Sequence, residues 1–455
     1  MTDFDPVLLA HVEDPDGYTL RAYELRGGYE SWKRALRDQT PEELTQTVKQ
    51  SGLRGRGGAG FPTGLKWTFL PQDHPGPIYF CLNADESEPG TFNNRILMEQ
   101  DPHQVLEGLM LSCYATRAST AYIYLRYEYP GCWTRLQAAI DDCYATGLLG
   151  EEIQGSDFTL NIYLHRGAAA YICGEETGLI ESLEGKRAWP RIKPPFPAVE
   201  GVFGKPTVVN NVETVACVKQ IVDRGIEWFQ SIGVPPDPDN SRDAGSYGPK
   251  LYCLSGHVER PGCYEAPLGI TVNELIDGFG GGVWKKRKAK AVIPGGISMG
   301  LLAADELDCP LDFSGPGRFG CLGLGTAAVV VMDDTTSMID FLHNSCQFFA
   351  HESCGQCTPC REGTAWAFTI LERIRRGHGR LQDLELLLEI GDNIGIMPGT
   401  TICGLADGAA WPIKNAIRKF REEFEEHIKR TNPDGYQRTE PVFALELLEP
   451  HEQGL

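Results

Sequence analysis

The sequence predicts an α/β protein in three parts: a layered α/β domain, a small α+β module and a helical domain that carries clustered cysteines. Strand-like and helix-like segments alternate through the first half, as expected for strands layered with helices. A stretch dense in turn formers follows at 233–249, and the pattern becomes helical after Thr335. A chain of 455 residues is also too long for one ordinary core, so several domains are expected.

The first domain shows helix and strand signals in alternation. "TPEELTQTVKQSGL" predicts a helix with Thr40 as N-cap, Pro41 at the first helical position and Glu43 completing a capping box. "PIYFCLN" and "AYIYLR" predict buried strands on either side of the helix-like "DPHQVLEGLMLSCYAT". "DFTLNIYLHR" is apolar at every second position, which is typical of a strand. Further helices are expected from about Glu175 and about Asn211.

The remaining sequence predicts a linker, a small module and a helical domain. The turn formers of 233–249 predict the linker. From Lys250 to about Asp334, "KLYCLSGHV", "AKAVIPGG" and "GTAAVVVMDD" predict strands and "TVNELIDGFGG" a single helix. "SMIDFLHNSCQFFAHE", "GTAWAFTILERIRR", "LQDLELLLEIGDNI" and "AWPIKNAIRKFREEFEEHIKR" predict helices. We expect domains at 1–240, 248–334 and 335–438, and a C-terminal tail at 439–455.

Composition excludes several classes of protein. The chain has 42 basic and 62 acidic residues, and its net charge of −20 disfavours nucleic acid and anionic lipid as partners. We expect no targeting segment at the N-terminus, and no apolar run approaches the roughly 18 to 20 residues of a membrane span. A soluble cytosolic protein is therefore expected, in which the fifteen cysteines indicate metal or redox chemistry in preference to disulfides.

Three cysteines recur at every third position in "HESCGQCTPCREG". Such a run with a fourth, distant cysteine is typical of a [4Fe–4S] cluster, and the loop "PGTTICGLADGAAWP" supplies a candidate for the fourth. The predicted metal ligands are Cys354, Cys357, Cys360 and Cys403. Structural zinc and reactive free thiols are the alternatives. We expect His351 to pack against neighbouring aromatic residues instead of binding metal.

A glycine-rich loop lies in "SGLRGRGGAGFPTGLKW", where Gly55, Gly57 and Gly60 have GxGxxG spacing. The ordinary Rossmann fingerprint needs a strand before this loop, whereas a helix is predicted here, so we reject that interpretation. Consecutive glycines still let the backbone approach a flat ring or a phosphate closely. We expect "FPTGLKW" to start a helix whose N–H groups face an anion. The alternative is an ordinary turn.

Carboxylates are concentrated in two further segments. Asp85, Glu86 and Glu88 directly follow the strand "PIYFCLN", and ligands of α/β domains bind at the carboxyl ends of strands. Glu175 and Glu176 stand at a predicted helix start, where interaction with the helix dipole alone is the alternative. The two asparagine amides of "VVNNVET" suit a flavin edge or a phosphate, and a helix cap is the alternative.

These segments, together with "HRGAAAYICGEET" and "KPPFPA", resemble the NADH-binding flavoprotein subunits of respiratory complex I, from about Gly28 to about Lys429. The resemblance implies FMN and NADH in a modified Rossmann-like domain, a small ubiquitin-like (β-grasp) module and one [4Fe–4S] cluster in a C-terminal helical bundle. The implied activity is that of an NADH:quinone oxidoreductase (NADH dehydrogenase), in which hydride passes from NADH to FMN and single electrons pass to the cluster and on towards quinone.

The resemblance also assigns cofactor-binding residues. FMN would be held by Gly55, Arg56, Gly57, Gly58, Lys66, Asn83, Asp85, Glu86, Tyr171, Gly174, Glu175, Val209, Asn210 and Asn211, with Ala59 and Gly60 in the same loop. The adenine ring of NADH would contact Phe61, Phe69 and Phe196, and its polar parts would lie near Glu88, Glu176 and Lys193. No catalytic acid or base is obligatory, and Glu86 and Glu176 are the nearest candidates. Glu176, together with Glu88, near the adenosine ribose would also repel a 2′-phosphate, which favours NADH over NADPH.

The chain departs from the family pattern at Asn93 and Asn94, and at Trp189 in "KRAWPRIK". The basic run "WKKRKAKA" from Trp284 to Ala291 is either a docking patch or a solvated face, and the second is the commoner case.

The resemblance implies partners and a location as well. The partners would be a thioredoxin-like [2Fe–2S] subunit and other peripheral-arm subunits. The chain would then lie on the cytoplasmic face of the inner membrane, associated with it only through the complex. One alternative is a diaphorase subunit of a soluble NAD-linked hydrogenase or formate dehydrogenase, although the extra cysteine-rich modules common there are not visible. A non-catalytic cluster-binding assembly subunit is another.

Overall fold

The computed structural model describes residues 4–71, 73–240 and 243–437. Its first domain is built on a parallel sheet of four strands in the order β3-β2-β1-β4. The strands are β1 (Tyr79–Ala84), β2 (Thr120–Leu125), β3 (Asn161–Arg166) and β4 (Thr207–Asn211). The strand order reverses between β1 and β4, and the crevice at the carboxyl ends of such strands is where α/β sheets bind ligands.

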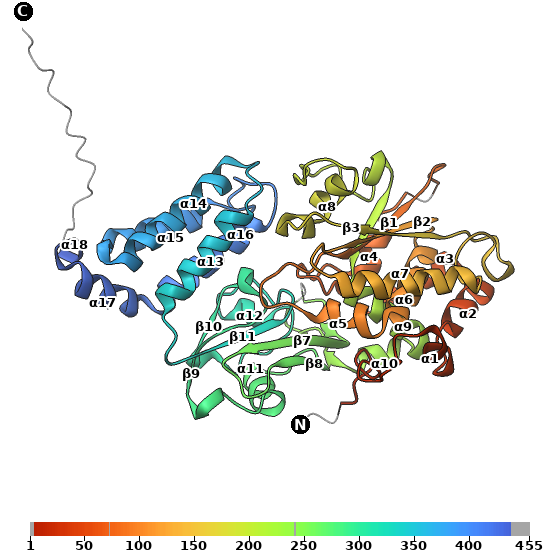
Figure 1. The fold of residues 1–455 in the computed structure, drawn as a ribbon, viewed down its shortest axis with the longest axis horizontal. Helices are drawn as coiled ribbons and strands as arrows, with labels where there is room; N and C mark the ends of the chain where they lie inside the picture. The colour runs from red at the N-terminus through yellow and green to blue at the C-terminus, as the bar shows by residue number, and fades with distance from the viewer. Residues whose placement is uncertain (1–3, 72, 241–242, 438–455) are drawn as a thin grey trace, which may run out of the picture.

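Helices cover both faces of this sheet (Figure 1). A large apolar core joins one face to helices that include α6 and α9, while a smaller core packs α8 against the other face. The helices are α1 (Leu20–Leu25), α2 (Glu30–Asp38), α3 (Pro41–Gln50), α4 (Thr63–Trp67), α5 (Asn93–Gln100), α6 (Pro102–Ala115), α7 (Pro130–Ala145), α8 (Glu176–Leu183), α9 (Val212–Arg224) and α10 (Ile226–Gln230). The 3₁₀ turns are Ile153–Gly155, Tyr171–Gly174 and Val202–Gly204.

Local signals account for the ends of several helices. The Thr40 hydroxyl accepts the Glu43 N–H, and the Glu43 carboxylate accepts the Thr40 N–H, which confirms the predicted capping box of α3. Asn211 caps α9 by accepting the Thr214 N–H over 3.3 Å. The sequence analysis did not predict α1, α2, α5, α7, α10 or strand β4. At α2 the reason is visible, because this helix begins after Tyr29, whose φ of 63° is unusual for a residue other than glycine.

The second part is a mixed five-stranded sheet in the order β10-β9-β11-β7-β8. Its strands are β7 (Pro249–Gly256), β8 (Gly262–Pro267), β9 (Ala289–Ile293), β10 (Leu302–Ala303) and β11 (Ala328–Asp333), and its helices are α11 (Val272–Glu274), continued by a π turn (Leu275–Phe279), and α12 (Gly315–Arg318). Short 3₁₀ turns are Trp284–Lys286, Ile297–Met299 and Ala304–Glu306. The sequence missed β8 and β10. The expected linker contains a small antiparallel pair, β5 (Gly233–Val234) and β6 (Ser246–Tyr247).

The third part is helical. It contains α13 (Met338–Glu352), α14 (Thr358–Arg373) with a π turn (Ile374–His378), α15 (Leu381–Asn393), α16 (Leu405–Lys419), α17 (Arg421–Thr431) and α18 (Pro433–Gln437). The last predicted helix is in fact two helices, which break at Phe420. The expected tail at 439–455 and residue 438 lie outside the described residues. Across the described chain, no helix has both the length and the apolar character needed to cross a bilayer.

A buried ion pair holds the first two parts together. The Lys250 ammonium in β7 lies 2.5 Å from the Glu213 carboxylate in α9, and both side chains are almost fully buried. The Asn93 amide and the Leu251 N–H also donate to Glu213, so the departure at Asn93 completes this network. Removing one partner of such a pair costs about 3–5 kcal/mol. The relative placement of the α/β domain and the mixed sheet is therefore strongly fixed.

Candidate functional site

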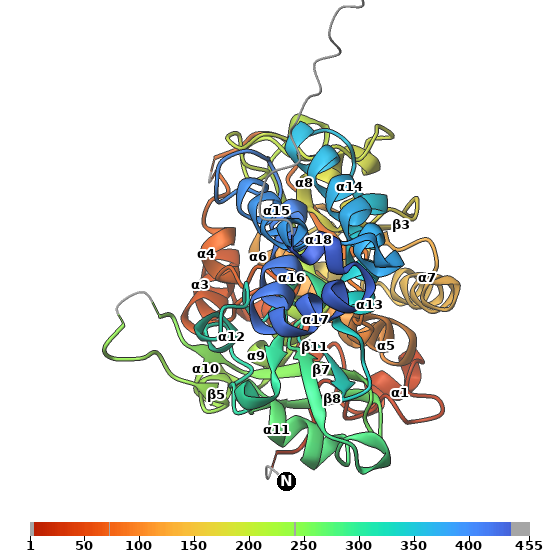
Figure 2. The ribbon, with the colours of Figure 1, turned by 90° about the vertical axis from the view of Figure 1, so that its left-hand side faces the viewer.

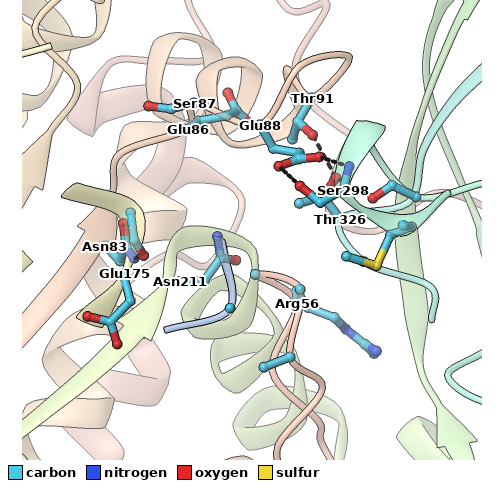
Figure 3. Close-up of a pocket in the computed structure, with 18 of the residues that line it drawn as sticks. Arg56, Asn83, Glu86, Ser87, Glu88, Thr91, Glu175, Asn211, Ser298 and Thr326 are labelled. Atoms are coloured by element: carbon cyan, nitrogen blue, oxygen red, sulfur yellow. Dashed lines mark hydrogen bonds between the residues drawn. The ribbon is translucent and has the colours of Figure 1, made fainter. Parts of the chain in front are cut away.

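An open cleft of about 530 Å³ lies where the three parts of the chain meet. The α/β domain contributes the glycine loop, the segment that follows β1 and the turn before α8. The mixed sheet contributes Ser298, Met299 and Thr326, and the helical domain contributes Gly404 and Leu405. The volume is typical of small-molecule and cofactor sites. Figure 3 shows the polar side chains of the first two parts facing each other across this cleft.

The glycine loop forms one wall because it runs very close to the start of α9. A side chain added at Gly57 would bring its Cβ to 3.0 Å from the Cβ of Asn211, and Gly58 has a φ of 129° that favours glycine. The Arg56 N–H donates to the Thr214 hydroxyl over 2.9 Å, which pins the loop to α9. The loop therefore offers bare backbone to the cleft, as the sequence predicted.

The Arg56 side chain is oriented differently from the expectation that it holds FMN. Its Nη2 donates to the Tyr247 carbonyl over 2.7 Å, and Figure 3 shows the guanidinium pointing away from Asn211 and Glu175. The side chain is 2% exposed, and its Nε and Nη1 have no hydrogen-bond partner among the described residues. Buried donors without partners indicate a site that a ligand or water completes.

Carboxylates after β1 line the floor of the cleft. The Asp85 carboxylate accepts the Ser87 hydroxyl, and burial raises its pKa to about 7. Glu86 accepts the N–H groups of Asn94 and Arg95 at the start of α5 together with the Tyr129 hydroxyl, and burial raises its pKa too. Asp85 can therefore gain or lose a proton near neutral pH, whereas the Glu86 carboxylate caps the N-terminus of α5.

Glu88 bridges the α/β domain and the mixed sheet. Its carboxylate accepts the Tyr171 hydroxyl over 2.6 Å and the Ser298 N–H and hydroxyl over 2.8 and 2.7 Å. Thr91 and Thr326 add a hydroxyl–hydroxyl contact of 2.6 Å nearby (Figure 3). Burial raises the pKa of Glu88. The structure therefore places Glu88 in a latch between the α/β domain and the mixed sheet, where it already accepts three hydrogen bonds.

Two lysines and two glutamates form a cluster of ion pairs beside the cleft. Lys66 donates to Glu176 over 2.7 Å and to the Val209 carbonyl over 2.9 Å, while Lys193 contacts Glu176 at 2.7 Å and Glu175 at 3.1 Å. Burial alone would raise the pKa of Glu176, but Lys66 and Lys193 outweigh it and lower this pKa to about 2. Glu176 is ionised and already paired with two cations.

The predicted cofactor-binding residues separate into two groups. Those that line the cleft are Arg56, Gly57, Gly58, Ala59, Asn83, Asp85, Glu86, Glu88, Tyr171, Gly174, Glu175 and Asn211. Those outside its lining are Gly55, Gly60, Phe61, Lys66, Phe69, Glu176, Lys193, Phe196, Val209 and Asn210. In this second group the three phenylalanine rings are about half exposed, and the rings of Phe61 and Phe69 lie 6.1 Å apart. Exposed aromatic rings of this kind suit stacking with a base.

The four predicted metal ligands line one small hollow in the helical domain, here called the sulfur hollow. Cys354 follows α13, Cys357 is the N-cap of α14, Cys360 lies in its first turn, and Cys403 precedes α16. The loop turns at Gly355, whose φ is 78°. Burial raises the pKa of Cys403 to about 12, so a metal is needed to hold this sulfur as thiolate at neutral pH.

The donor set of the sulfur hollow fits an iron–sulfur cluster. Four thiols are the usual ligands of a cubane cluster. Among the described residues, no three His, Cys, Asp or Glu side chains are grouped to hold a single metal ion. The four thiols and their spacing in the sequence favour a cluster.

The expectation for His351 is wrong, because its side chain is 84% exposed. Two residues of helix turn it by roughly 200° from the buried Phe349, onto the solvent side of α13.

The cleft and the sulfur hollow adjoin each other. Leu405, two residues after Cys403, lines both of them. Tyr171 lines the cleft, and its N–H donates to Glu352, two residues before Cys354. No sequence pattern indicated that Leu405, Ser298, Met299 and Thr326 would line the cleft. Their place in it depends on how distant segments of the chain pack.

The fold and these two sites define an α/β protein with a cofactor-sized cleft, joined to a helical domain that carries four clustered thiols. Three family models match the chain: the Nuo51 FMN-binding domain over 48–220, the SLBB domain over 251–301 and the NADH-ubiquinone oxidoreductase-F iron-sulfur binding region over 340–427. The F 2 subunit of the NADH-quinone oxidoreductase of Rhizobium meliloti is 52% identical, with coverage of 94% of this chain and 98% of the relative. The F subunit of the same enzyme in Streptomyces coelicolor is 48% identical, with coverage of 93% and 91%.

The chain belongs to the family of F subunits of NADH-quinone oxidoreductase. Its fold also matches a crystal structure of NAD⁺-reducing [NiFe]-hydrogenase in the H₂-reduced state, with a TM-score of 0.78 and 36% identity over 90% of this chain and 66% of that one. These findings confirm the predicted fold class and the FMN-binding and iron–sulfur regions. A chain of this family is one component of a larger enzyme.

Proposed function

We propose that this chain is the electron-input subunit of an NADH:quinone oxidoreductase, which oxidises NADH and delivers single electrons towards quinone. The observation that carries the proposal is the shared wall of the cleft and the sulfur hollow at Leu405. A site for a two-electron carrier and a site for a one-electron carrier then lie side by side in one polypeptide. Such a pair converts hydride into single electrons.

Residues of the cleft fit FMN. Gly57 and Gly58 offer bare backbone, while the amide of Asn83 and the start of α9 at Asn211 are fixed by hydrogen bonds to Gly174 and Thr214. When bound, FMN accepts hydride and gives up electrons singly, and the cluster takes them one at a time. In this proposal the chain holds these groups and keeps an exchangeable proton on Asp85.

Residues beside the cleft fit NADH. Phe61, Phe69 and Phe196 present exposed rings for the adenine, and Lys193 provides a hydrogen-bond donor for the polar parts of NADH, while Lys66 stays assigned to FMN. Glu176 keeps both lysines in place through its two ion pairs. Glu88, which the resemblance placed near NADH, is instead occupied by Tyr171 and Ser298. We therefore assign Glu88 to closing the cleft and not to binding NADH directly.

The cluster ligands in this proposal are Cys354, Cys357, Cys360 and Cys403, and the functional units are 1–240, 248–334 and 335–438. The proposed partners are a thioredoxin-like [2Fe–2S] subunit and other peripheral-arm subunits, which together would hold the chain on the cytoplasmic face of the inner membrane. Affinity purification of the tagged chain from its own cells tests this: a co-purifying small [2Fe–2S] protein supports the assignment.

A second candidate is favoured by one specific observation. The match to the NAD⁺-reducing [NiFe]-hydrogenase makes a diaphorase subunit of such an enzyme the alternative. The same purification distinguishes the two, because a nickel-containing partner would identify the hydrogenase type.

The primary test uses the purified, anaerobically reconstituted chain. We expect about one FMN and four irons per chain, and reduction of ferricyanide by NADH. A colourless protein without this activity would overturn the proposal and favour a non-catalytic assembly subunit. Zinc in place of iron at the four cysteines would overturn the cluster assignment.

A further inference from the structure

One hydrogen bond joins the NADH side of the α/β domain to the backbone of a proposed cluster ligand. Trp189 Nε1 donates to the carbonyl oxygen of Cys354 over 3.0 Å, between residues 165 positions apart in the sequence. Trp189 lies between α8 and Lys193, and Cys354 is the first of the clustered cysteines. The contact therefore exists only because the helical domain packs against the α/β domain.

The orientation of the indole is fixed on several sides. The guanidinium of Arg187 lies 5.3 Å from the centroid of the indole ring. The backbone N–H of Trp189 donates to the Arg187 carbonyl over 2.7 Å. Ala188 packs against the cores on both sides of this segment, and Pro190 is buried. The indole is 39% exposed, yet its single N–H is directed to the protein and not to water.

The loop that receives this hydrogen bond is anchored at three successive points. The Glu352 carboxylate accepts the Tyr171 N–H over 3.0 Å, the Cys354 carbonyl accepts Trp189, and the Gly355 carbonyl accepts Arg361 Nη1 over 2.8 Å. Among these contacts, only the one from Trp189 reaches the peptide of a cysteine itself. Peptide groups and donors around the ligands of a cluster tune its reduction potential.

We propose that Trp189 is a positioning residue of the iron–sulfur cluster. The indole N–H of Trp189 fixes the Cys354 peptide group. The positive end of this N–H dipole stabilises the extra electron of the reduced cluster. The reduction potential of the cluster is therefore higher with this hydrogen bond than without it. This inference rests on the proposed function, since it takes Cys354 as a cluster ligand. It also gives a structural role to a residue at which the chain departs from the family pattern.

The substitution Trp189→Phe tests the inference, because it keeps an aromatic ring beside Arg187 and removes the N–H. The full-length reconstituted chain is analysed for iron, for the electron paramagnetic resonance spectrum of the reduced cluster and for its midpoint potential. We expect unchanged iron content, a shifted spectrum and a more negative potential. Trp366→Phe is the matched control: Trp366 is 59% exposed on α14, and its indole makes no hydrogen bond to any described residue.

The outcomes separate this inference from the proposed function. Absence of iron in the unsubstituted chain would overturn the proposed function itself. Iron in both chains, with the same spectrum and potential in Trp189→Phe as in Trp366→Phe, would overturn the role of Trp189 alone. If Trp189→Phe binds less iron, the titration is made on its iron-loaded fraction. A more negative potential there supports the inference, and an unchanged or more positive one overturns it.

Discussion

The cleft and the sulfur hollow hold their ligands by opposite strategies. The cleft is open, and it is assembled from segments of all three parts of the chain, with polar side chains of the first two parts lying among its lining residues (Figure 3). The sulfur hollow is small, lies within the helical domain and takes three of its four thiols from the segment 354–360, which runs from the end of α13 into the first turn of α14. Figure 2, which looks at the structure from the helical side, shows α13, α14 and α16 lying close together in this domain.

The difference follows from the strength of the individual contacts. Metal–thiolate bonds are strong, so four cysteine sulfurs are enough to hold a cluster. The main requirement of this site is therefore that the four residues are cysteines. A flavin and a nucleotide are held by many weaker contacts, each of which must already be in place before binding. The cleft accordingly contains preset hydrogen bonds such as the latch of Glu88 with Tyr171 and Ser298. Single substitutions should therefore abolish one site but only weaken the other.

The largest effect is expected from Cys403→Ala. Losing one of four ligands should remove the cluster, so iron content and the paramagnetic signal of the reduced cluster should fall to near zero. FMN content and bleaching of the flavin by NADH should remain. Cys263→Ala, a partly exposed cysteine in β8, is the control and should keep its iron. Full iron content in Cys403→Ala would show that the sulfur hollow does not need this ligand.

A smaller effect is expected from Gly57→Ala in the cleft. The new Cβ would lie 3.0 Å from the Cβ of Asn211, so the loop must shift where it meets FMN. We expect the Kd for FMN to rise about tenfold, which corresponds to about 1.4 kcal/mol, in a fluorescence titration of the flavin-free protein. Gly317→Ala in α12 adds a methyl group in open space and should leave this Kd unchanged. Equal Kd values for both variants would contradict the proposed close approach.

The pH dependence of stability tests the electrostatics of the cleft. Burial raises the pKa of Asp85 to about 7 in the folded chain, so the folded state binds the extra proton. This contribution to stability is fully present below the usual pKa of the group and is lost as the pH rises to about 7. In the flavin-free protein, Asp85→Asn should therefore be more stable than the unsubstituted chain at pH 8, by about 4 kcal/mol.

Thermal unfolding at several pH values measures the effect of Asp85→Asn, and the advantage should shrink towards pH 5. The exposed Asp277 provides the control Asp277→Asn, which should show no such trend. An advantage that is the same at both pH values would mean that packing, and not the buried charge, is responsible.

The smallest effect is expected from Glu176→Gln on the choice between NADH and NADPH. Its carboxylate is already paired with Lys66 and Lys193, so its repulsion of a 2′-phosphate is weakened. We expect the ratio of kcat/KM for NADH to that for NADPH to fall less than about fivefold, or about 1 kcal/mol. Glu181→Gln, which removes a pair with Arg191 outside the cleft lining, is the matched control. A fall of a hundredfold would restore Glu176 as the main determinant of specificity.

The sequence alone determined the features that depend on local chemistry. The spacing of Cys354, Cys357 and Cys360, the capping box at Thr40 and the succession of buried strands are all set by residues a few positions apart. Within so short a distance, the backbone geometry leaves few arrangements. The glycine loop was predicted for the same reason, since close approach of backbone requires glycine wherever the loop is placed.

Only the tertiary structure decided which of these features act together. It turned Arg56 towards Tyr247, used Glu88 as a latch to Ser298, and placed Leu405 between the cleft and the sulfur hollow. It also brought Trp189 to the Cys354 carbonyl. Each of these contacts joins distant parts of the chain, and its partner is selected by the packing of whole domains. The residues next to each of these side chains in the sequence therefore do not predict its contact partner.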